Sequence, residues 1–222
     1  TFIIIFLFIN INAFAAISYV DDIDIPANGS NGQNIPHGVA FNSDGTKLFL
    51  AGTDDQEINE YNLSTAYDVS TSVHQNTYFN GDGLEFVAIA FNTNGTKLFI
   101  YHTAGTDSIK QYSLSSPYNL SNPTLQKQST GTSDKNFQTI ESQPSGFTFS
   151  SDGSKMFITG KNKDKVQEFN LSTPFDLSSV SRTNGYDISG QIAAVGGVSF
   201  SADGLKMFVL DSDNDAANKD VN

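Results

Sequence analysis

Short apolar runs separated by polar turn sequences recur four times along the chain in nearly the same ten-residue pattern. Each copy begins with Phe, continues through Asp-Gly or Asn-Gly to Lys, and ends in three apolar residues, with Phe as the middle one. Asp-Gly and Asn-Gly suit tight hairpin turns because these residues tolerate positive φ. Each copy therefore predicts two short strands, A and B, joined by a tight turn. The copies begin at Phe41, Phe91, Phe149 and Phe200.

Strand B carries three consecutive apolar residues in every copy, such as Leu48, Phe49 and Leu50 in the first. A strand with one face in water alternates apolar and polar residues, so an unbroken apolar run predicts that both faces are covered.

A second motif follows the first three copies in step, and reads Glu60-Tyr-Asn-Leu-Ser-Thr-Ala-Tyr-Asp-Val-Ser70 in the first of them. It predicts a strand C, a turn and a strand D. Its aromatic residues recur in register, which favours packing in the core and at turns over a platform for stacking sugars. Strand C is expected over residues 58–63, 109–114 and 166–171.

Four-stranded units repeated every 50 to 58 residues predict an all-β fold, a β-propeller of antiparallel blades. An open solenoid or a stacked sandwich is the alternative, although solenoid repeats are usually shorter. One column of small residues supports the propeller, since the innermost strands crowd together at the central axis. That column holds Gly38, Ala88, Gly146 and Gly197.

These motifs resemble the YVTN/NHL-type, lactonase-like repeats of bacterial exported β-propellers in the WD40-like superfamily. The resemblance rests on the Phe-x-x-Asp-Gly-x-Lys-Leu-Phe pattern followed by a Glu-Tyr-x-Leu-Ser strand, and it covers residues 36–222. It implies the fold. It leaves the activity open, because such propellers serve as binding platforms, lactonases and surface-layer modules.

The repeats divide residues 16–222 into blades that start near residues 36, 86, 144 and 195. Alignment places Val221 at the start of strand C of the last copy, so we expect an incomplete final blade and a lone outer strand over residues 17–25. Either the natural chain continues and completes the ring, which we prefer, or residues 17–25 pair with the last copy to close four blades. A truncated ring is expected to expose an apolar blade face and to associate.

Residues 1–15 predict a secretory signal peptide, with an apolar run followed by Ala13-Phe14-Ala15 as the cleavage pattern. The run is about half of the roughly 20 residues that a membrane-spanning helix needs. The alternative is a buried strand. No basic region precedes the run, so we expect that a few N-terminal residues are missing. We expect export to a periplasm, the cell surface or the medium, with no membrane span after the signal is removed.

Charge and composition exclude several classes of function. The chain has 12 Lys and Arg against 24 Asp and Glu, a formal net charge of −12, and its one arginine is Arg182. Nucleic acid is therefore not an expected partner, because phosphate binding needs a basic surface. The absence of cysteine excludes a disulfide framework, a thiolate metal site and a cysteine nucleophile.

The candidate ligand-binding residues lie where strands meet the B–C and D–A connections. These connections form one rim of a propeller, and the copies differ in length only there. Variable loops on a constant scaffold usually carry binding chemistry. His37 and Glu85 are placed at the starts of strands A, and His102 at the end of a strand B.

One metal hypothesis is a calcium site near the end of the chain. Asp211, Asp213 and Asp215 alternate as oxygen ligands do in calcium loops, but Ala216 and Asn222 break the EF-hand pattern. A solvated acidic loop is the simpler interpretation.

We expect a non-enzymatic exported module that binds a protein, glycan or small molecule through this rim, and no catalytic residue is assigned. The alternatives are a lactonase-like hydrolase with a metal-activated water near His37 and a structural module of a larger surface protein.

Overall fold

The computed structural model describes residues 36–52, 57–79, 85–103, 108–128, 140–141, 143–162, 165–190, 192, 195–201 and 203–211. The expected signal peptide (residues 1–15), the strand at 17–25, Asp213, Asp215 and Val221 lie outside these residues.

The described residues form three antiparallel sheets of four strands and one strand pair, and each sheet follows chain order from its inner to its outer strand. Blade 1 comprises β1 (Pro36–Phe41), β2 (Lys47–Gly52), β3 (Glu57–Leu63) and β4 (Ser72–Phe79). Blade 2 comprises β5 (Glu85–Phe91), β6 (Lys97–Thr103), β7 (Ser108–Ser113) and β8 (Thr124–Gln128). Blade 3 comprises β9 (Pro144–Phe149), β10 (Lys155–Gly160), β11 (Lys165–Leu171) and β12 (Val180–Asp187). The described part of blade 4 comprises β13 (Val195–Phe200) and β14 (Met207–Asp211). Two short 3-10 turns, η1 (Val69–Thr71) and η2 (Leu177–Ser179), precede β4 and β12 respectively.

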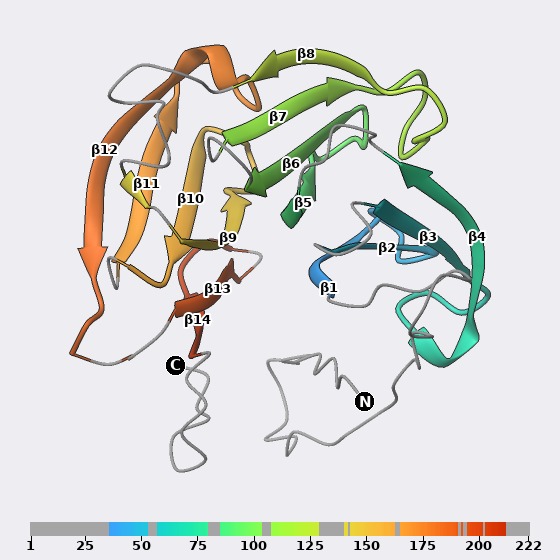
Figure 1. The fold of residues 1–222 in the computed structure, drawn as a ribbon, viewed down its shortest axis with the longest axis horizontal. Coiled ribbons are helices and arrows are strands. Elements are labelled where there is room, and N and C mark those ends of the chain that lie inside the picture. Colours follow the sequence, from blue (N-terminus) through green and yellow to red (C-terminus); the bar gives the residue numbers. More distant parts are fainter. Residues whose placement is uncertain are drawn as a thin grey trace.

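The sheets stand radially around a common centre and form an open ring (Figure 1). Strands β1, β5, β9 and β13 lie nearest the centre, and β4, β8 and β12 lie on the circumference. This is the all-β propeller that the repeats predict. Among the described residues, no helix is long and apolar enough to cross a membrane.

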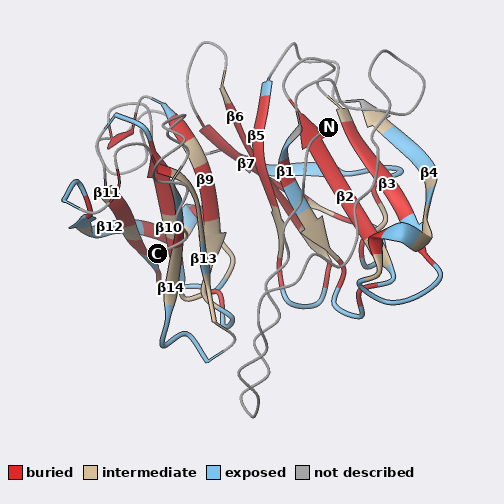
Figure 2. Cartoon of the chain, turned by 90° about the horizontal axis from the view of Figure 1, so that it is seen from below, coloured by how far each residue is buried: buried red, intermediate tan, exposed pale blue. Residues whose placement is uncertain are grey.

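Both faces of strand B are buried in blades 1 and 2, as its apolar run predicts, whereas Phe157 in blade 3 and Met207 and Phe208 in blade 4 are half-buried. Phe49 is 0% exposed and packs in the apolar cluster shared with blade 2, while Leu48, also 0% exposed, belongs to a cluster on the other face of blade 1. Further clusters join blade 2 to blade 3 and blade 3 to blade 4. Figure 2 shows the contrast between the buried strands β2 and β3 and the exposed outer strand β4.

The small residues of strand A lie where neighbouring blades touch, as expected. A Cβ atom added to Gly38 would lie 3.1 Å from the Cα atom of Ala88 in the next blade. One added to Gly146 would lie 3.1 Å from the Cα atom of Gly197. The inner strands are therefore close enough that backbone meets backbone.

A feature that the sequence did not reveal is a register irregularity near the start of every strand A. One residue of strand A is skipped near the start of each A–B ladder: His37, Val87, Ser145 and Gly196. Such bulges bend a strand and redirect side chains, and they are frequent beside functional sites.

Candidate binding rim

The rim formed by the A–B and C–D turns is built in nearly the same way in blades 1 to 3, and we call it the turn rim. Asp44 Oδ1 accepts hydrogen bonds from Thr46 through the backbone N–H (3.0 Å) and the hydroxyl (2.6 Å). Asp152 accepts equivalent bonds from Ser154, and donation from Ser150 and Ser154 lowers the pKa of Asp152 to about 2. These side chains are engaged in stabilising their own turns.

The opposite rim, at the B–C and D–A connections, differs from blade to blade, and we call it the variable rim. It begins at four equivalent pairs near the ends of the A–B ladders: Pro36 with Gly52, Phe86 with His102, Pro144 with Gly160, and Val195 with Asp211. The bulges lie next to these pairs. The same backbone scaffold therefore presents different side chains at each blade.

His37 is the bulged residue of β1, and its side chain is exposed. Glu85 begins β5, the inner strand of the next blade, and is also exposed. Its Oε2 atom accepts a hydrogen bond of 3.2 Å from the Thr103 hydroxyl. The structure thus places both predicted residues on adjacent inner strands at the same rim.

His102 has a different setting from the other two candidates, because it is only 2% exposed. Its Nε2 atom lies 2.7 Å from the Ser108 hydroxyl, which links the end of β6 to the start of β7 across the B–C connection. The buried imidazole therefore links β6 to β7 at the variable rim of blade 2.

Asp211 ends β14 and is paired with Val195 at the position that His102 occupies in blade 2. The other two members of the predicted calcium loop lie outside the described residues. Within those residues, no group of three or more His, Cys, Asp or Glu side chains is placed to hold a metal ion. The calcium hypothesis stays a prediction.

Glu141 is a rim residue that the sequence analysis missed. Its side chain is 0% exposed, and its Oε1 atom accepts hydrogen bonds from the backbone N–H groups of Gln143 (2.9 Å) and Asn162 (3.1 Å). It lies over Gly160, where an added Cβ would come within 2.1 Å of Glu141 Cγ. The carboxylate thus ties the D–A connection of blade 2 to the B–C connection of blade 3. The only sequence signal is the extra length of this copy.

The rim of blade 3 carries an exposed aromatic residue beside charges. Tyr186 is 65% exposed near the end of β12. Asp187 follows it and forms a 3.4 Å ion pair with Lys165 at the start of β11. Hydrogen bonds donated by Ser189, and further by Lys165, lower the pKa of Asp187. An exposed tyrosine next to oriented charges is typical of interaction surfaces.

Several solved structures share this fold. The Pseudomonas aeruginosa periplasmic gluconolactonase matches with a TM-score of 0.52 and 18% identity, over 81% of this chain and 51% of that one. The fold is that of a β-propeller. A putative 6-phosphogluconolactonase from Bacteroides uniformis matches with a TM-score of 0.54 and 10% identity, over 84% of this chain and 52% of that one.

The propeller therefore spans about half the length of the structures it resembles. A second putative 6-phosphogluconolactonase, from Bacteroides fragilis, matches at a TM-score of 0.51 and 12% identity, over 84% of this chain and 52% of that one. At these identities the likeness establishes the fold alone. No protein-family model and no curated protein matches the chain.

Proposed function

We propose that the protein is an exported, non-enzymatic propeller that binds a protein, glycan or small-molecule ligand at the variable rim. The observation that carries the proposal is the contrast between the two rims. The turn rim repeats the same self-satisfied turns, whereas the variable rim places His37, Glu85, Asp187 and Tyr186 on one end of the blades with their side chains exposed. A diverse, exposed surface on a rigid scaffold is suited to recognition.

The buried groups of this rim support the proposal by fixing its shape. The bond between His102 and Ser108 and the carboxylate of Glu141 hold connections that link neighbouring strands and blades. A preorganised surface loses less conformational entropy on binding than a mobile one. We therefore assign His102 and Glu141 to positioning, and His37 and Glu85 to contact with the ligand.

The test uses the full chain and two probes, an immobilised glycan array and a phage-displayed peptide library. We expect at least one glycan or peptide to bind. We also expect the double variant His37→Ala, Glu85→Ala to weaken that binding about 10-fold or more, as the loss of contact residues does. The matched control is Ser64→Ala, Ser115→Ala, which alters two exposed residues of the turn rim.

Equal loss of binding in the rim variant and the control contradicts the proposal, and so does the absence of any binder from both libraries. If the wild type hydrolyses a lactone and the rim variant does not, the protein is the lactonase-like hydrolase that the sequence analysis gives as the alternative.

Export has its own test, since it depends on residues 1–15. We propose cleavage after Ala15, so that a chain secreted by a bacterial host begins at Ala16. Mass spectrometry of the secreted protein checks this. A secreted product that retains residues 1–15 contradicts it.

A further inference from the structure

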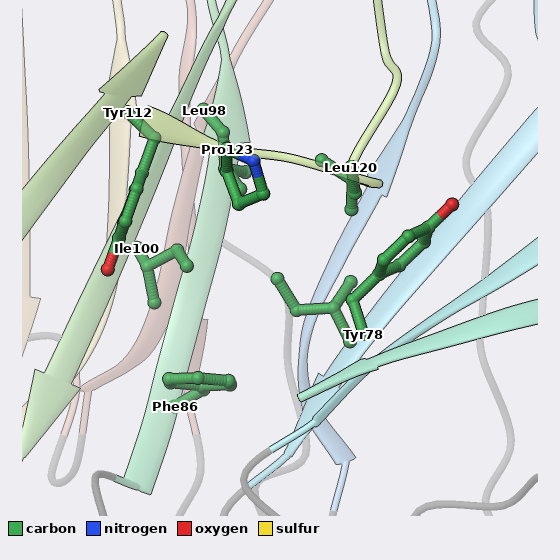
Figure 3. Close-up of a pocket in the computed structure, with 8 residues that line it drawn as sticks. Tyr78, Phe86, Leu98, Ile100, Tyr112, Leu120 and Pro123 are labelled. Carbon is green, nitrogen blue, oxygen red and sulfur yellow. The ribbon is translucent and has the colours of Figure 1, made fainter. Parts of the chain in front are cut away.

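A cavity of about 220 Å³ lies between blades 1 and 2. Blade 1 contributes residues of β3 and β4 to its lining, and blade 2 contributes β5, β6, β7 and the connection to β8 (Figure 3). Tyr78 is half-buried and Pro123 is exposed, so these two residues mark the mouth. The lining includes Ile58, Tyr78, Phe86, Ile100, Tyr112 and Pro123.

The other two described blade interfaces pack isoleucines in the corresponding region. Between blades 3 and 4, Val195 and Val209 match Phe86 and Ile100 of the cavity by ladder register, and Ile188 and Ile192 pack against them. These isoleucines come from the connection that follows β12. The chain itself thus shows that this region of a blade interface accepts inserted apolar groups.

The interface between blades 2 and 3 repeats this arrangement. Ile158 and Phe169 match Ile100 and Tyr112, and Ile140, from the connection before β9, packs in the same cluster and is 4% exposed. The cavity therefore lies in a region that both sister interfaces fill with apolar side chains.

Tyr78 distinguishes the first interface further. It packs against the cluster between blades 1 and 2, whereas Tyr186, its counterpart in blade 3, is 65% exposed. With Phe86 and Tyr112, it gives the cavity an aromatic lining. Aromatic rings prefer edge-to-face or offset contacts with other rings.

We propose that this cavity binds a small, uncharged molecule of one aromatic ring. The size is suitable, since an engineered cavity of about 150 Å³ lined by apolar side chains stays dry and accepts benzene. The aromatic lining favours a ring over a flexible alkyl chain, because a rigid ring loses little conformational entropy on entry.

The lining offers an anionic ligand no counter-ion, because every residue that lines the cavity is uncharged. The Tyr78 hydroxyl donates a 2.7 Å hydrogen bond to Glu60 Oε2, and Glu60 is 3% exposed and paired with Lys47. The chain as a whole carries a formal charge of −12. A carboxylate on the ligand would lose its hydration without gaining a cation.

The test uses the full chain, with toluene as the neutral probe and benzoate as its charged analogue. We expect toluene to raise the melting temperature in a saturable way, because it binds only the folded state. In NMR spectra we expect nuclear Overhauser contacts between toluene and the Ile100 methyl groups. Benzoate is expected to bind at least about 10-fold more weakly.

The variant Ile100→Phe fills the cavity and should abolish the effect of toluene. Val73→Phe adds the same ring at an exposed site (61% exposed) and should leave it unchanged. Toluene binding that survives in Ile100→Phe, or saturable binding without contacts to Ile100 in the wild type, overturns the proposal. So does the absence of saturable binding, and equal binding of benzoate refutes the preference for neutral ligands. None of these results depends on the variable rim.

Discussion

The phenol oxygen of Tyr118 accepts a 3.1 Å hydrogen bond from the backbone N–H of Ser43, which lies 75 residues earlier in the neighbouring blade. On the same turn, the Tyr67 hydroxyl donates to the carbonyl oxygen of Ser43 at 3.2 Å. One A–B turn is thus held by aromatic residues from two blades. Phe175, the counterpart in blade 3, has no hydroxyl, so blades 1 and 2 have a tether that this position cannot supply between blades 2 and 3.

Tyr118→Phe should lower the free energy of unfolding by about 0.5–1.5 kcal/mol, the usual net value of one such bond. Urea titration measures this. Tyr67→Phe is the control. It should lower the free energy of unfolding by less, because Tyr67 is 42% exposed and its hydrogen bond stays within one blade. An equal or larger loss in Tyr67→Phe argues against a special role for the tether.

A second prediction concerns Gly95, which has φ of +69° and lies against the Tyr118 ring. An added Cβ would come within 2.3 Å of Tyr118 Cε2. Gly95→Ala should therefore lower the free energy of unfolding by about 1–2 kcal/mol through left-handed backbone strain. The overlap with the ring should lower it by about 1–3 kcal/mol more. Thermal or urea unfolding of the variant measures the sum.

Gly204→Ala is the matched control, because φ is +71° and no described atom lies within 4 Å of the added Cβ. Gly204→Ala should therefore lower the free energy of unfolding by the backbone strain alone. In a Tyr118→Ala background, the cost of Gly95→Ala should fall to the Gly204→Ala value. An unchanged cost would show that the ring plays no part.

The close approach of inner strands gives a third prediction. A Cβ at Gly38 would lie 3.0 Å from the backbone nitrogen of Ile89, so Gly38→Val forces blades 1 and 2 apart. A loss of at least about 2 kcal/mol is expected, as for overpacked core positions. Gly190→Val, at an exposed turn with no neighbour within 4 Å of the added Cβ, should stay within about 0.5 kcal/mol of the wild type in urea unfolding. Equal stability of the two variants contradicts the contact.

A fourth prediction follows from Tyr78. Burial, together with its hydrogen bond to Glu60, raises the pKa of Tyr78 from its ordinary value of 10.0 to about 12. Above pH 10 the unfolded chain loses this proton first, so stability should fall as pH rises from about 10 to 12. Below pH 10 both states keep the proton, and the residue contributes no slope.

The urea midpoint, measured across that pH range, should fall less steeply in Tyr78→Phe. Some slope should remain, because burial also raises the pKa of Tyr61. If the slope in Tyr78→Phe is identical to that of the wild type, Tyr78 does not contribute to the fall in stability above pH 10. Tyr186→Phe, the same substitution at a tyrosine that is 65% exposed, serves as the control.

Much of the fold was predictable because repeated patterns carry their own evidence. The apolar runs, the turn glycines and the small residues of strand A each occur four times, so an accidental match in one copy does not change the predicted fold. Burial of Tyr61 (4% exposed), Tyr112 (7%) and Phe169 (0%) confirms that these recurring aromatics are core residues.

The candidate site was less predictable because it lies where the copies differ. His37 and Glu85 are exposed on the predicted rim, but His102 is buried and bonded to Ser108. Glu141 has no counterpart in the other copies to draw attention to it. Nor does the sequence indicate that Tyr67, Tyr118 and Phe175 adopt positive φ, which is uncommon for aromatic residues.

By itself, the sequence determined the blade: its four strands, its turns and its two covered faces, because local periodicity and turn chemistry act within a few tens of residues. The tertiary structure decided what happens between blades: the bulges that turn His37 outward, the tether from Tyr118 to Ser43 and the cavity beside Tyr78. These depend on how two sheets distant in sequence meet, and contact between them is governed by shape and packing, which no single repeat encodes.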